Sequence, residues 1–167
     1  MFVLFRVPFP SLEKTVPLCY NMNMVKNKKI TIRYAQESDR DFWFSLDAHL
    51  SAEQFQIKVR DKQGYVLLSD GVPSGILRYN LYWDNTPFCN LLYVKEGCRK
   101  QGYGKALMRF WEREMHAQGY ELLLVSTRSD EDAQYFYRKT GYTQCGNLNL
   151  PEQTTELFFE KQLTDSI

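Results

Sequence analysis

Short stretches of the chain alternate between apolar and polar residues, and this pattern predicts β-strands. Residues 29–35 (KITIRYA) alternate and contain several β-branched side chains, which is typical of a strand. Turn-forming sequences such as DGVPSG at 70–75 separate the strands that follow. A nearly continuous apolar run, ELLLVST, indicates a buried strand. The strands expected after the first lie at 65–69, 75–83, 88–94, 121–127, 142–145 and 156–162.

Apolar residues recur every three or four positions between these strands, which predicts amphipathic helices. The longest helix is expected from residue 102 to about residue 118, with Gly119 as the residue that ends it. Two helical pieces are expected to begin near residues 39 and 51, the first of them capped by Ser38. Asp130 is expected to cap the last helix, and Gly141 to end it.

The predicted order of elements, β-α-α-β-β-β-α-β-α-β-β, indicates a mixed sheet with helices on its faces, within the α/β (α+β) class. We expect a non-conforming N-terminal extension at 1–27 and a single domain at 28–167. The first 23 residues are apolar and contain three prolines, and they lack the leading cation and cleavage site of a signal peptide. The preferred interpretation is an upstream-start artefact, since Met22 and Met24 offer alternative starts. The alternative is an arm that packs on the domain or on a partner.

Composition excludes several classes of protein. Hydrophobic residues make up 44% of the 167 residues and charged residues 25%, which excludes a disordered or collagen-like chain. The formal net charge of +1 offers no overall field for nucleic acid, and no apolar run is long enough to span a bilayer. The cysteines and histidines are too dispersed for a metal site. We therefore expect a cytoplasmic protein with reduced thiols, no metal, no nucleic acid and no membrane partner.

The segment RKQGYGKAL at 99–107 concentrates glycine and positive charge between a predicted strand and a predicted helix. Glycine lets backbone N–H groups approach a ligand, and N–H groups at a helix N-terminus lack partners within the helix. With the helix dipole and the side chains of Arg99, Lys100 and Lys105, they predict a phosphate site. The Walker and dinucleotide patterns do not fit, because Tyr103 and Leu107 stand where Lys and Gly are needed. A solvated, flexible loop is the alternative interpretation.

The pattern Arg99-x-x-Gly102-x-Gly104, after a strand that ends LLYV, resembles the acetyl-CoA loop of the GCN5-related N-acetyltransferase (GNAT) superfamily. A second block, DEDAQYFYRKTGY at 130–142, resembles that family's N-x-x-A-x-x-F-Y-x-x-x-G-F segment, although an Asp stands in place of its Asn. The residues in register are Ala133, Phe136, Tyr137, Gly141 and Tyr142. The similarity covers about residues 29–163, and two blocks in this order are more specific than either one.

The resemblance implies a mostly antiparallel central sheet of about six or seven strands flanked by about four helices. Two central strands would splay apart around the pantetheine arm of acetyl-CoA, the implied cosubstrate. Backbone groups at the end of one strand would bind the arm, and loop amides would hold the pyrophosphate. By resemblance, the cofactor-binding residues are Leu92, Tyr93, Val94, Arg99, Lys100, Gln101, Gly102, Tyr103, Gly104, Lys105, Ala133 and Phe136.

The resemblance also implies an N-acetyltransferase in which a primary amine attacks the thioester directly. Tyr137 matches the family tyrosine that often protonates the departing thiolate, and a core aromatic is the competing interpretation. Many relatives place a Glu near position 90, where this chain has Asn90, which cannot take a proton. A water relay is one alternative. The other candidates for the base are Asp84, Glu53, His49 and Glu96.

The acceptor is expected to be the amine of a small molecule or of a peptide. Four aromatic residues of the third and fourth strands either line its pocket or fill the core and an edge: Tyr79, Tyr82, Trp83 and Phe88. Relatives commonly form dimers, and an exposed edge strand could pair in a homodimer. An acyl-CoA-binding sensor without turnover is the second hypothesis, which the missing carboxylate at Asn90 favours and Tyr137 disfavours.

Overall fold

The computed structural model describes residues 20–25 and 28–164, with side chains described from residue 28 onward. The interpretations of residues 1–19 lie outside this part of the chain. The strands are β1 (Tyr20–Val25), β2 (Lys28–Tyr34), β3 (Gly64–Ser69), β4 (Val72–Tyr82), β5 (Thr86–Val94), β6 (Leu122–Arg128), β7 (Thr143–Leu148) and β8 (Glu156–Gln162). The helices are α1 (Arg40–Phe44), α2 (Ala52–Arg60), α3 (Tyr103–Ala117) and α4 (Ala133–Lys139), with 3₁₀ turns η1 (Glu37–Asp39) and η2 (Glu96–Cys98).

The described strands form one eight-stranded sheet in the order β1-β2-β3-β4-β5-β6-β8-β7. β5 and β6 run parallel, and every other neighbouring pair is antiparallel. This confirms the predicted mixed, mostly antiparallel sheet flanked by helices. Residues 20–25 pair with β2 although the sequence pattern predicted no strand there. The sheet therefore has one strand more than expected, on the N-terminal side of the boundary predicted after residue 27.

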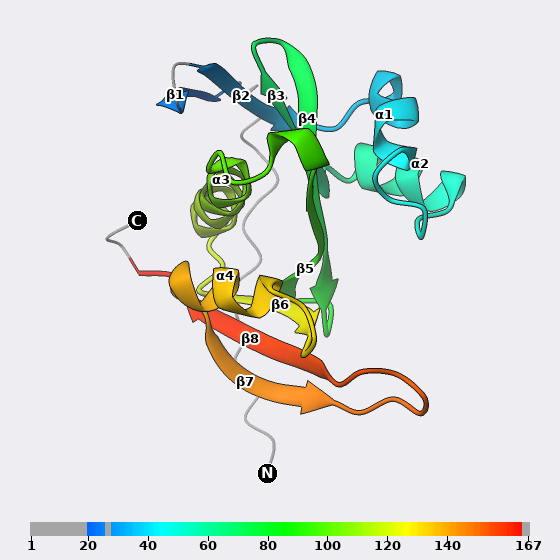
Figure 1. Cartoon of the computed structure of the whole chain (residues 1–167), viewed down its shortest axis with the longest axis vertical. Coiled ribbons are helices and arrows are strands. Elements are labelled where there is room, and N and C mark those ends of the chain that lie inside the picture. Colours follow the sequence, from blue (N-terminus) through cyan, green and yellow to red (C-terminus); the bar gives the residue numbers. More distant parts are fainter. Residues whose placement is uncertain (1–19, 26–27, 165–167) are drawn as a thin grey trace.

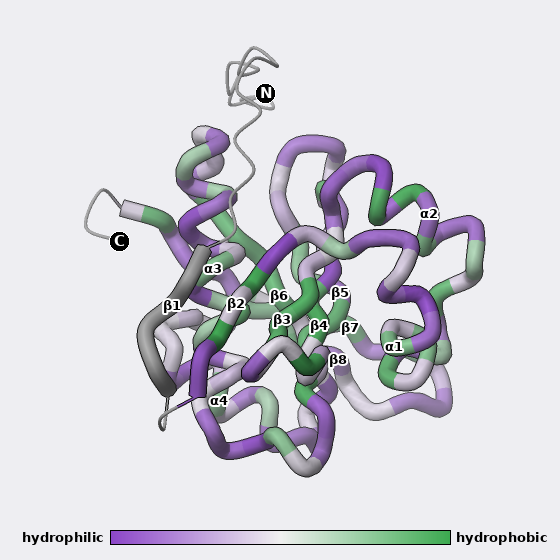
Figure 2. The backbone as a smooth tube through the Cα atoms, turned by 90° about the horizontal axis from the view of Figure 1, so that it is seen from above, coloured by the Kyte–Doolittle hydropathy of each residue, from purple (hydrophilic) through white to green (hydrophobic). Residues whose placement is uncertain are grey.

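Helices cover both faces of this sheet. In Figure 1, α1 and α2 lie on one side of the central strands and α3 lies on the other. The α3 side holds the larger buried cluster, which includes Tyr65, Phe110 and Trp111. The smaller cluster, on the side of α1 and α2, includes Trp43 and Phe55. Figure 2 shows the hydrophobic segments concentrated in the central strands, with hydrophilic segments in the surrounding loops.

α3 forms because one stripe of its surface is apolar. All four residues of the predicted stripe are buried: Leu107, Phe110, Trp111 and Met115. The helix ends just before Gly119, whose φ of +87° lies in the left-handed region that favours glycine. Neither α3 nor any other helix in the described ranges is long and apolar enough to cross a membrane.

Two of the predicted N-caps are wrong. Ser38 lies inside η1 and caps nothing, while the neighbouring Asp39 is buried and accepts hydrogen bonds from Arg33 at 2.6 and 2.8 Å. The carboxylate of Asp130 accepts hydrogen bonds from Arg128 at 2.6 and 3.0 Å, and it does not cap α4. In both places an arginine on the preceding strand donates two charge-assisted hydrogen bonds to a carboxylate, which fixes the position of that carboxylate. Asp39 Oδ2 also accepts a hydrogen bond from the backbone N–H of Gln36 at 2.8 Å.

Candidate functional site

The candidate site lies where β5 and β6 separate. The two strands pair at only two positions, Phe88 with Leu124 and Cys89 with Val125. β5 continues to Val94, and beyond Cys89 its edge has no strand partner on the β6 side in the described part of the chain. Backbone N–H and C=O groups along this edge are therefore available to an extended ligand.

A β-bulge at Asn90 marks the start of this separation. On β4, Tyr79 faces Cys89 and the preceding Arg78 faces Leu91, so Asn90 is an extra residue in β5. The bulge changes the alternation of the strand. Leu92 and Val94 pack with the cluster under α3, whereas Leu91 and Tyr93 pack with the cluster under α1 and α2. Both faces of the separated edge are consequently walled by apolar side chains.

The loop between β5 and α3 brings backbone amides to the open end of this edge. Lys100 and Gly102 adopt left-handed φ values of +59° and +84°, and Gly102 is the N-cap of α3 without a side-chain cap. The first backbone N–H to bond within the helix is that of Ala106, which donates to Gly102 O at 3.0 Å. The N–H groups of residues 103–105 therefore precede the helical ladder, at the positive end of a 15-residue helix with no acidic residue in its first turn.

Two side chains of the loop, those of Arg99 and Tyr103, pack against the sheet. Arg99 folds back onto β5, where its Nε donates to Val94 O at 3.1 Å and its guanidinium lies 5.1 Å from the Tyr93 ring centroid. Tyr103 is buried, and its hydroxyl lies 2.8 Å from Ser69 Oγ, so the ring anchors α3 to β3. Of the predicted residues in this loop, Tyr103 can therefore meet a ligand only through its backbone.

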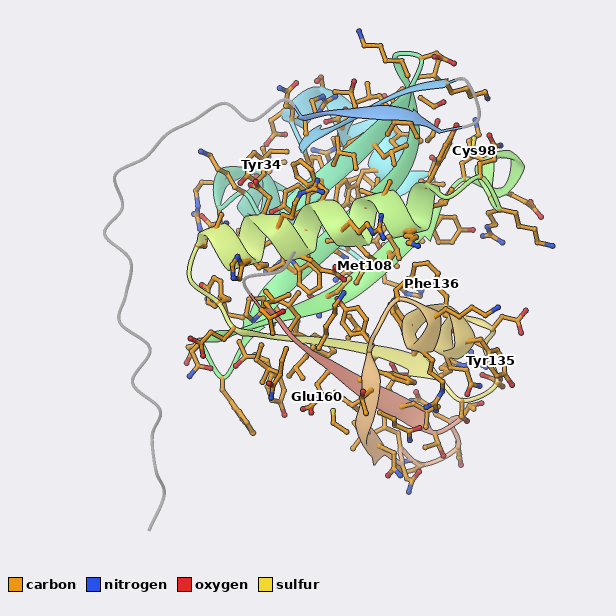
Figure 3. The ribbon with its side chains drawn as sticks, turned by 90° about the vertical axis from the view of Figure 1, so that its left-hand side faces the viewer. Tyr34, Cys98, Met108, Tyr135, Phe136 and Glu160 are labelled. Atoms are coloured by element: carbon orange, nitrogen blue, oxygen red, sulfur yellow. The ribbon has the colours of Figure 1, made fainter. Side chains whose placement is uncertain are left out.

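Phe136 and Gly104 approach each other across the site. A Cβ atom placed on Gly104 would lie 3.6 Å from the Phe136 ring and 3.9 Å from Leu92. Figure 3 shows Phe136 on α4, directed toward the N-terminal half of α3, while Tyr135 points away from it. Leu92, Gly104 and Phe136, which the sequence blocks predicted separately, are thus brought together by the fold.

Tyr137 lies at the apex of the separation. Its ring packs against Phe136, Tyr142 and Phe159 at centroid distances of 5.4, 5.8 and 6.0 Å, and only 6% of the residue is exposed. Burial raises the pKa of the Tyr137 hydroxyl well above its usual value, and the nearby Cys89 thiol raises this pKa further. The phenol is therefore protonated at neutral pH. It is a core aromatic as well as a candidate proton donor.

A basic pocket adjoins the amide loop and lies between α3, the C-terminal end of α4 and β8. Its volume is about 310 Å³, and its lining residues are Lys105, Met108, Arg109, Glu112, Lys139, Thr140, Gly141 and Lys161. Glu112 is buried and accepts hydrogen bonds from Lys161 at 2.9 Å and from the Tyr142 hydroxyl at 3.1 Å. The acidic group of the pocket is thus already neutralised, and the remaining lining favours an anion.

The candidates for the base do not gather at the separation. Asn90 is exposed on the bulge, and Asp84 is exposed in the turn between β4 and β5. The other three candidates are exposed on α2, on the loop before it and in η2: Glu53, His49 and Glu96. Within residues 28–164, no group of three His, Cys, Asp or Glu side chains is placed to hold a metal ion.

One pair of residues beside the bulge had no signal in the sequence. Arg78 lies opposite Leu91, and its Nε donates to Asp47 Oδ2 at 2.7 Å. The Asp47 side chain is fully buried and the Arg78 side chain is 15% exposed. The pair joins the segment between α1 and α2 to β4. Because its members are 31 residues apart, no local motif could have identified it.

Comparisons with known proteins concern the family and the fold of the chain. The family model described as "Acetyltransferase (GNAT) family" matches residues 29–142. No curated protein matches the chain significantly. Among solved structures, Ard1 from Thermoplasma volcanium superimposes with a TM-score of 0.73 at 18% identity, over 81% of this chain and 99% of its own.

Two further structures are similar at the same level. A GNAT family acetyltransferase from Elizabethkingia anophelis, with acetyl-CoA bound, has a TM-score of 0.65 at 19% identity, over 80% of this chain and 98% of its own. The ribosomal-protein-alanine N-acetyltransferase from Brucella melitensis has a TM-score of 0.69 at 19% identity, over 79% of this chain and 99% of its own. At these identities, the solved structures establish the shared fold.

Proposed function

The chain belongs to the acetyltransferase (GNAT) family, and from that premise we propose that it transfers the acetyl group of acetyl-CoA to a primary amine. The acceptor amine attacks the thioester carbonyl directly. A C–N bond forms, the C–S bond breaks, and no acyl-enzyme intermediate is needed.

The observation that carries the proposal is the unpaired edge of β5 leading to the free amides of α3. An acyl-CoA substrate combines an extended arm that contains two amide groups with a diphosphate. The edge beyond Cys89 offers backbone partners to the arm in the manner of an added strand, through residues 92–94. The N–H groups of residues 103–105 suit the diphosphate. The strand edge for the arm and the amides for the diphosphate therefore follow one another along the chain, in the same order as the arm and the diphosphate of the ligand.

Three cations of the basic pocket extend this surface: Lys105, Arg109 and Lys139. Lys105 belongs to both the amide loop and the pocket, so an anionic group beyond the diphosphate would meet these side chains. We propose that they contribute to affinity for acetyl-CoA and take no part in the chemical step. Replacement of each by Gln would then raise the KM for acetyl-CoA and leave kcat unchanged. Arg60→Gln, on the exposed end of α2, is a matched control.

We propose that Tyr137 is the proton donor. As the C–S bond breaks, the phenol O–H gives its proton to the sulfur, and the tyrosinate recovers a proton before the next turnover. The raised pKa of Tyr137 keeps this proton in place until charge develops on sulfur. Its position beside Cys89, at the apex of the strand separation, supports the assignment.

The attacking amine also has to lose a proton. Asn90 has no basic group, and the carboxylates considered as alternatives are exposed on separate elements. We propose that water at the bulge accepts the proton from the amine nitrogen. Because the bulge exposes Asn90 beside the unpaired edge, solvent has access from the face opposite Tyr137.

The proposal is tested by titrating acetyl-CoA calorimetrically and by measuring free thiol released with a panel of small amines and peptides. We expect saturable binding, and thiol release that requires an amine and matches the N-acetyl product found by mass spectrometry. Heat without thiol release across the panel would favour a sensor that binds acyl-CoA without turnover. If folded protein gave no heat, the assignment of the cosubstrate would be wrong.

A further inference from the structure

Four aromatic side chains form a continuous wall on the face of the sheet opposite Tyr137. Tyr82 lies 4.7 Å from Trp83 and 6.1 Å from Phe88, and Phe88 lies 5.9 Å from Phe158, all between ring centroids. The Phe88 and Phe158 rings are nearly parallel, with an interplanar angle of 26°. The wall joins β4, β5, β8 and the turn between β4 and β5.

The alternation of side chains along the strands assigns this wall to one face. Phe88 precedes Cys89, which belongs to the cluster under α3, and Phe158 precedes Phe159, which packs against Tyr137. Neighbouring residues of a strand point to opposite faces, so Phe88 and Phe158 point away from Tyr137. Tyr82 shares a face with Arg78, which is paired with Asp47 on the side of α1 and α2.

The wall begins at the site of reaction. Phe88 and Leu124 form the pair immediately before the last one between β5 and β6, and the strands separate after Cys89. An acceptor that approaches the separation from the face opposite Tyr137 therefore passes over Phe88. Tyr135 is an exposed aromatic residue on α4, and it does not lie on this approach to the separation.

The wall is exposed and is held by a strained turn. Trp83 is 78% exposed and Tyr82 is 38% exposed. Trp83 and Asp84 have φ values of +52° and +62°, in the left-handed region, which disfavours a bulky side chain such as that of Trp83. Exposed aromatic surface in a strained turn destabilises the folded state, and such features are typical of binding sites.

Carboxylates lie next to the wall. Glu160 is two residues from Phe158 on β8, so both side chains share one face, and Glu160 pairs in register with Leu124, the partner of Phe88. The Glu160 charge also acts on Cys145 of the neighbouring strand β7. Burial is the larger cause of the raised pKa of Cys145, and the Glu160 charge raises this pKa further. Asp84 adjoins Trp83 in the turn. A ligand of this wall is therefore expected to combine an apolar planar group with positive charge.

We infer that the acceptor carries an aromatic ring on a short chain next to its primary amine. The inference rests on the proposed function and specifies its substrate. The ring stacks on the wall formed by Tyr82, Trp83, Phe88 and Phe158, and the amine reaches the separation beyond Phe88. The carboxylate of Glu160 attracts the ammonium form before it loses its proton. The same chemistry is offered by a free arylalkylamine and by a peptide whose first residue is aromatic.

The test compares matched amines in the thiol-release assay. 2-Phenylethylamine is paired with propylamine, and a tetrapeptide amide beginning with Phe is paired with one beginning with Ala. We expect kcat/KM to be at least about tenfold higher for the aromatic member of one pair, because its ring contacts several aromatic side chains at once. The pair that shows the preference identifies the source of the amine. Equal values within both pairs would overturn the inference and leave the proposed function standing.

Variants assign the preference to the wall. Trp83→Ala and Phe158→Leu should each reduce the aromatic preference by about 2- to 10-fold, with the KM for acetyl-CoA unchanged. Tyr135→Ala removes an aromatic that is 58% exposed on α4, and it should leave the preference intact. An equal loss in the Tyr135→Ala variant would contradict the assignment. A second copy of the chain covering the wall would also contradict it. That outcome would be seen as a dimer that the Trp83→Ala substitution makes monomeric without changing the amine preference.

A binding measurement keeps this inference separate from the proposed function. If no amine released thiol, the fluorescence of Trp83 would still report 2-phenylethylamine at the wall. We expect a saturable change in the wild-type protein that is lost in the Trp83→Phe variant. No change in the wild-type protein with either 2-phenylethylamine or the tetrapeptide amide beginning with Phe would overturn the inference whatever the catalytic result.

Discussion

Replacement of Tyr137 by Phe removes one oxygen atom from the apex of the site and leaves the packing in place. The ring contacts with Phe136, Tyr142 and Phe159, at 5.4, 5.8 and 6.0 Å, are available to phenylalanine as well. We therefore expect the free energy of unfolding to change by less than about 1.5 kcal/mol, as for other volume-conserving substitutions.

The effect on turnover should be much larger. A positioned proton donor contributes about 10²- to 10⁴-fold to a rate, which corresponds to about 2.7–5.4 kcal/mol at 1.36 kcal/mol per decade. Since Tyr137 is only 6% exposed, water has little access to replace the missing hydroxyl. We expect kcat to fall at least a hundredfold, with the KM for acetyl-CoA within about threefold of wild type, because the amides of α3 are untouched.

The assay is thiol release at saturating acetyl-CoA and amine, combined with thermal unfolding and a pH profile. Tyr135→Phe, an exposed neighbour on α4, is the control and should be as active as wild type. Because the pKa of Tyr137 is raised, the wild-type kcat should show no loss from tyrosine ionisation up to about pH 10. The reasoning is refuted if the Tyr137→Phe variant folds normally and turns over within about threefold of wild type.

Three further predictions concern stability. Gly102→Ala should destabilise the protein by about 1–2 kcal/mol and weaken acetyl-CoA binding, because φ at Gly102 is +84°. Gly97→Ala is the control, since a Cβ atom at Gly97 meets open space in the same loop. The control should change neither the melting temperature nor the affinity measured by calorimetry. Lys161→Met should lower the free energy of unfolding in urea by about 2–4 kcal/mol, because it breaks the pair with the buried Glu112. This is somewhat below the usual loss for a broken buried pair, since the lysine side chain is 20% exposed. Adding Glu112→Leu should recover most of the lost free energy, and no recovery would contradict the ion-pair explanation. Burial is the largest cause of raised pKa values at six tyrosines: Tyr34, Tyr65, Tyr79, Tyr120, Tyr137 and Tyr142. Stability should therefore be intact below about pH 10 and fall as pH rises through the higher folded-state pKa values. Ultraviolet titration should show the four buried tyrosines ionising only as the protein unfolds: Tyr65, Tyr79, Tyr137 and Tyr142.

The elements that the sequence predicted well are those whose signal is local. The stripe of α3 and the left-handed Gly119 that ends it are both encoded within a few residues, and both are confirmed. The Asp-Gly turn between β3 and β4 is similar, because Asp70 and Gly71 adopt left-handed φ values of +50° and +80°. Local steric preference decides each of these features.

The elements that the sequence predicted poorly depend on partners far along the chain. Ser38 and Asp130 looked like N-caps, but arginines on the preceding strands bind the nearby carboxylates. The strand at residues 20–25 depends on pairing with β2 and has no alternation strong enough to reveal it. The energy gained when two strands pair cannot be inferred from the residues of one strand alone.

The candidate site shows the same division. The glycine loop was visible as a motif, but the inward fold of Arg99 onto Tyr93 was not, because it needs the end of β5 to be in place. The wall that joins Phe88 to Phe158 brings together residues 70 positions apart and could not be inferred from the aromatic cluster of β4 and β5 alone. Long-range register, rather than residue type, assembles these parts.

The single extra residue in β5 stands outside the alternation of the strand, so the edge of the strand and the packing of its faces are controlled separately. As far as Cys89 the strand pairs with both β4 and β6, and beyond Asn90 it pairs, among the described strands, with β4 alone. Deleting Asn90 would leave Cys89, Leu92 and Val94 on the α3 face and Leu91 and Tyr93 on the face of α1 and α2, because the remaining residues alternate regularly. The deletion would remove the bulge alone. Loss of this one residue should therefore act on the open edge of the strand and spare the hydrophobic clusters on its two faces.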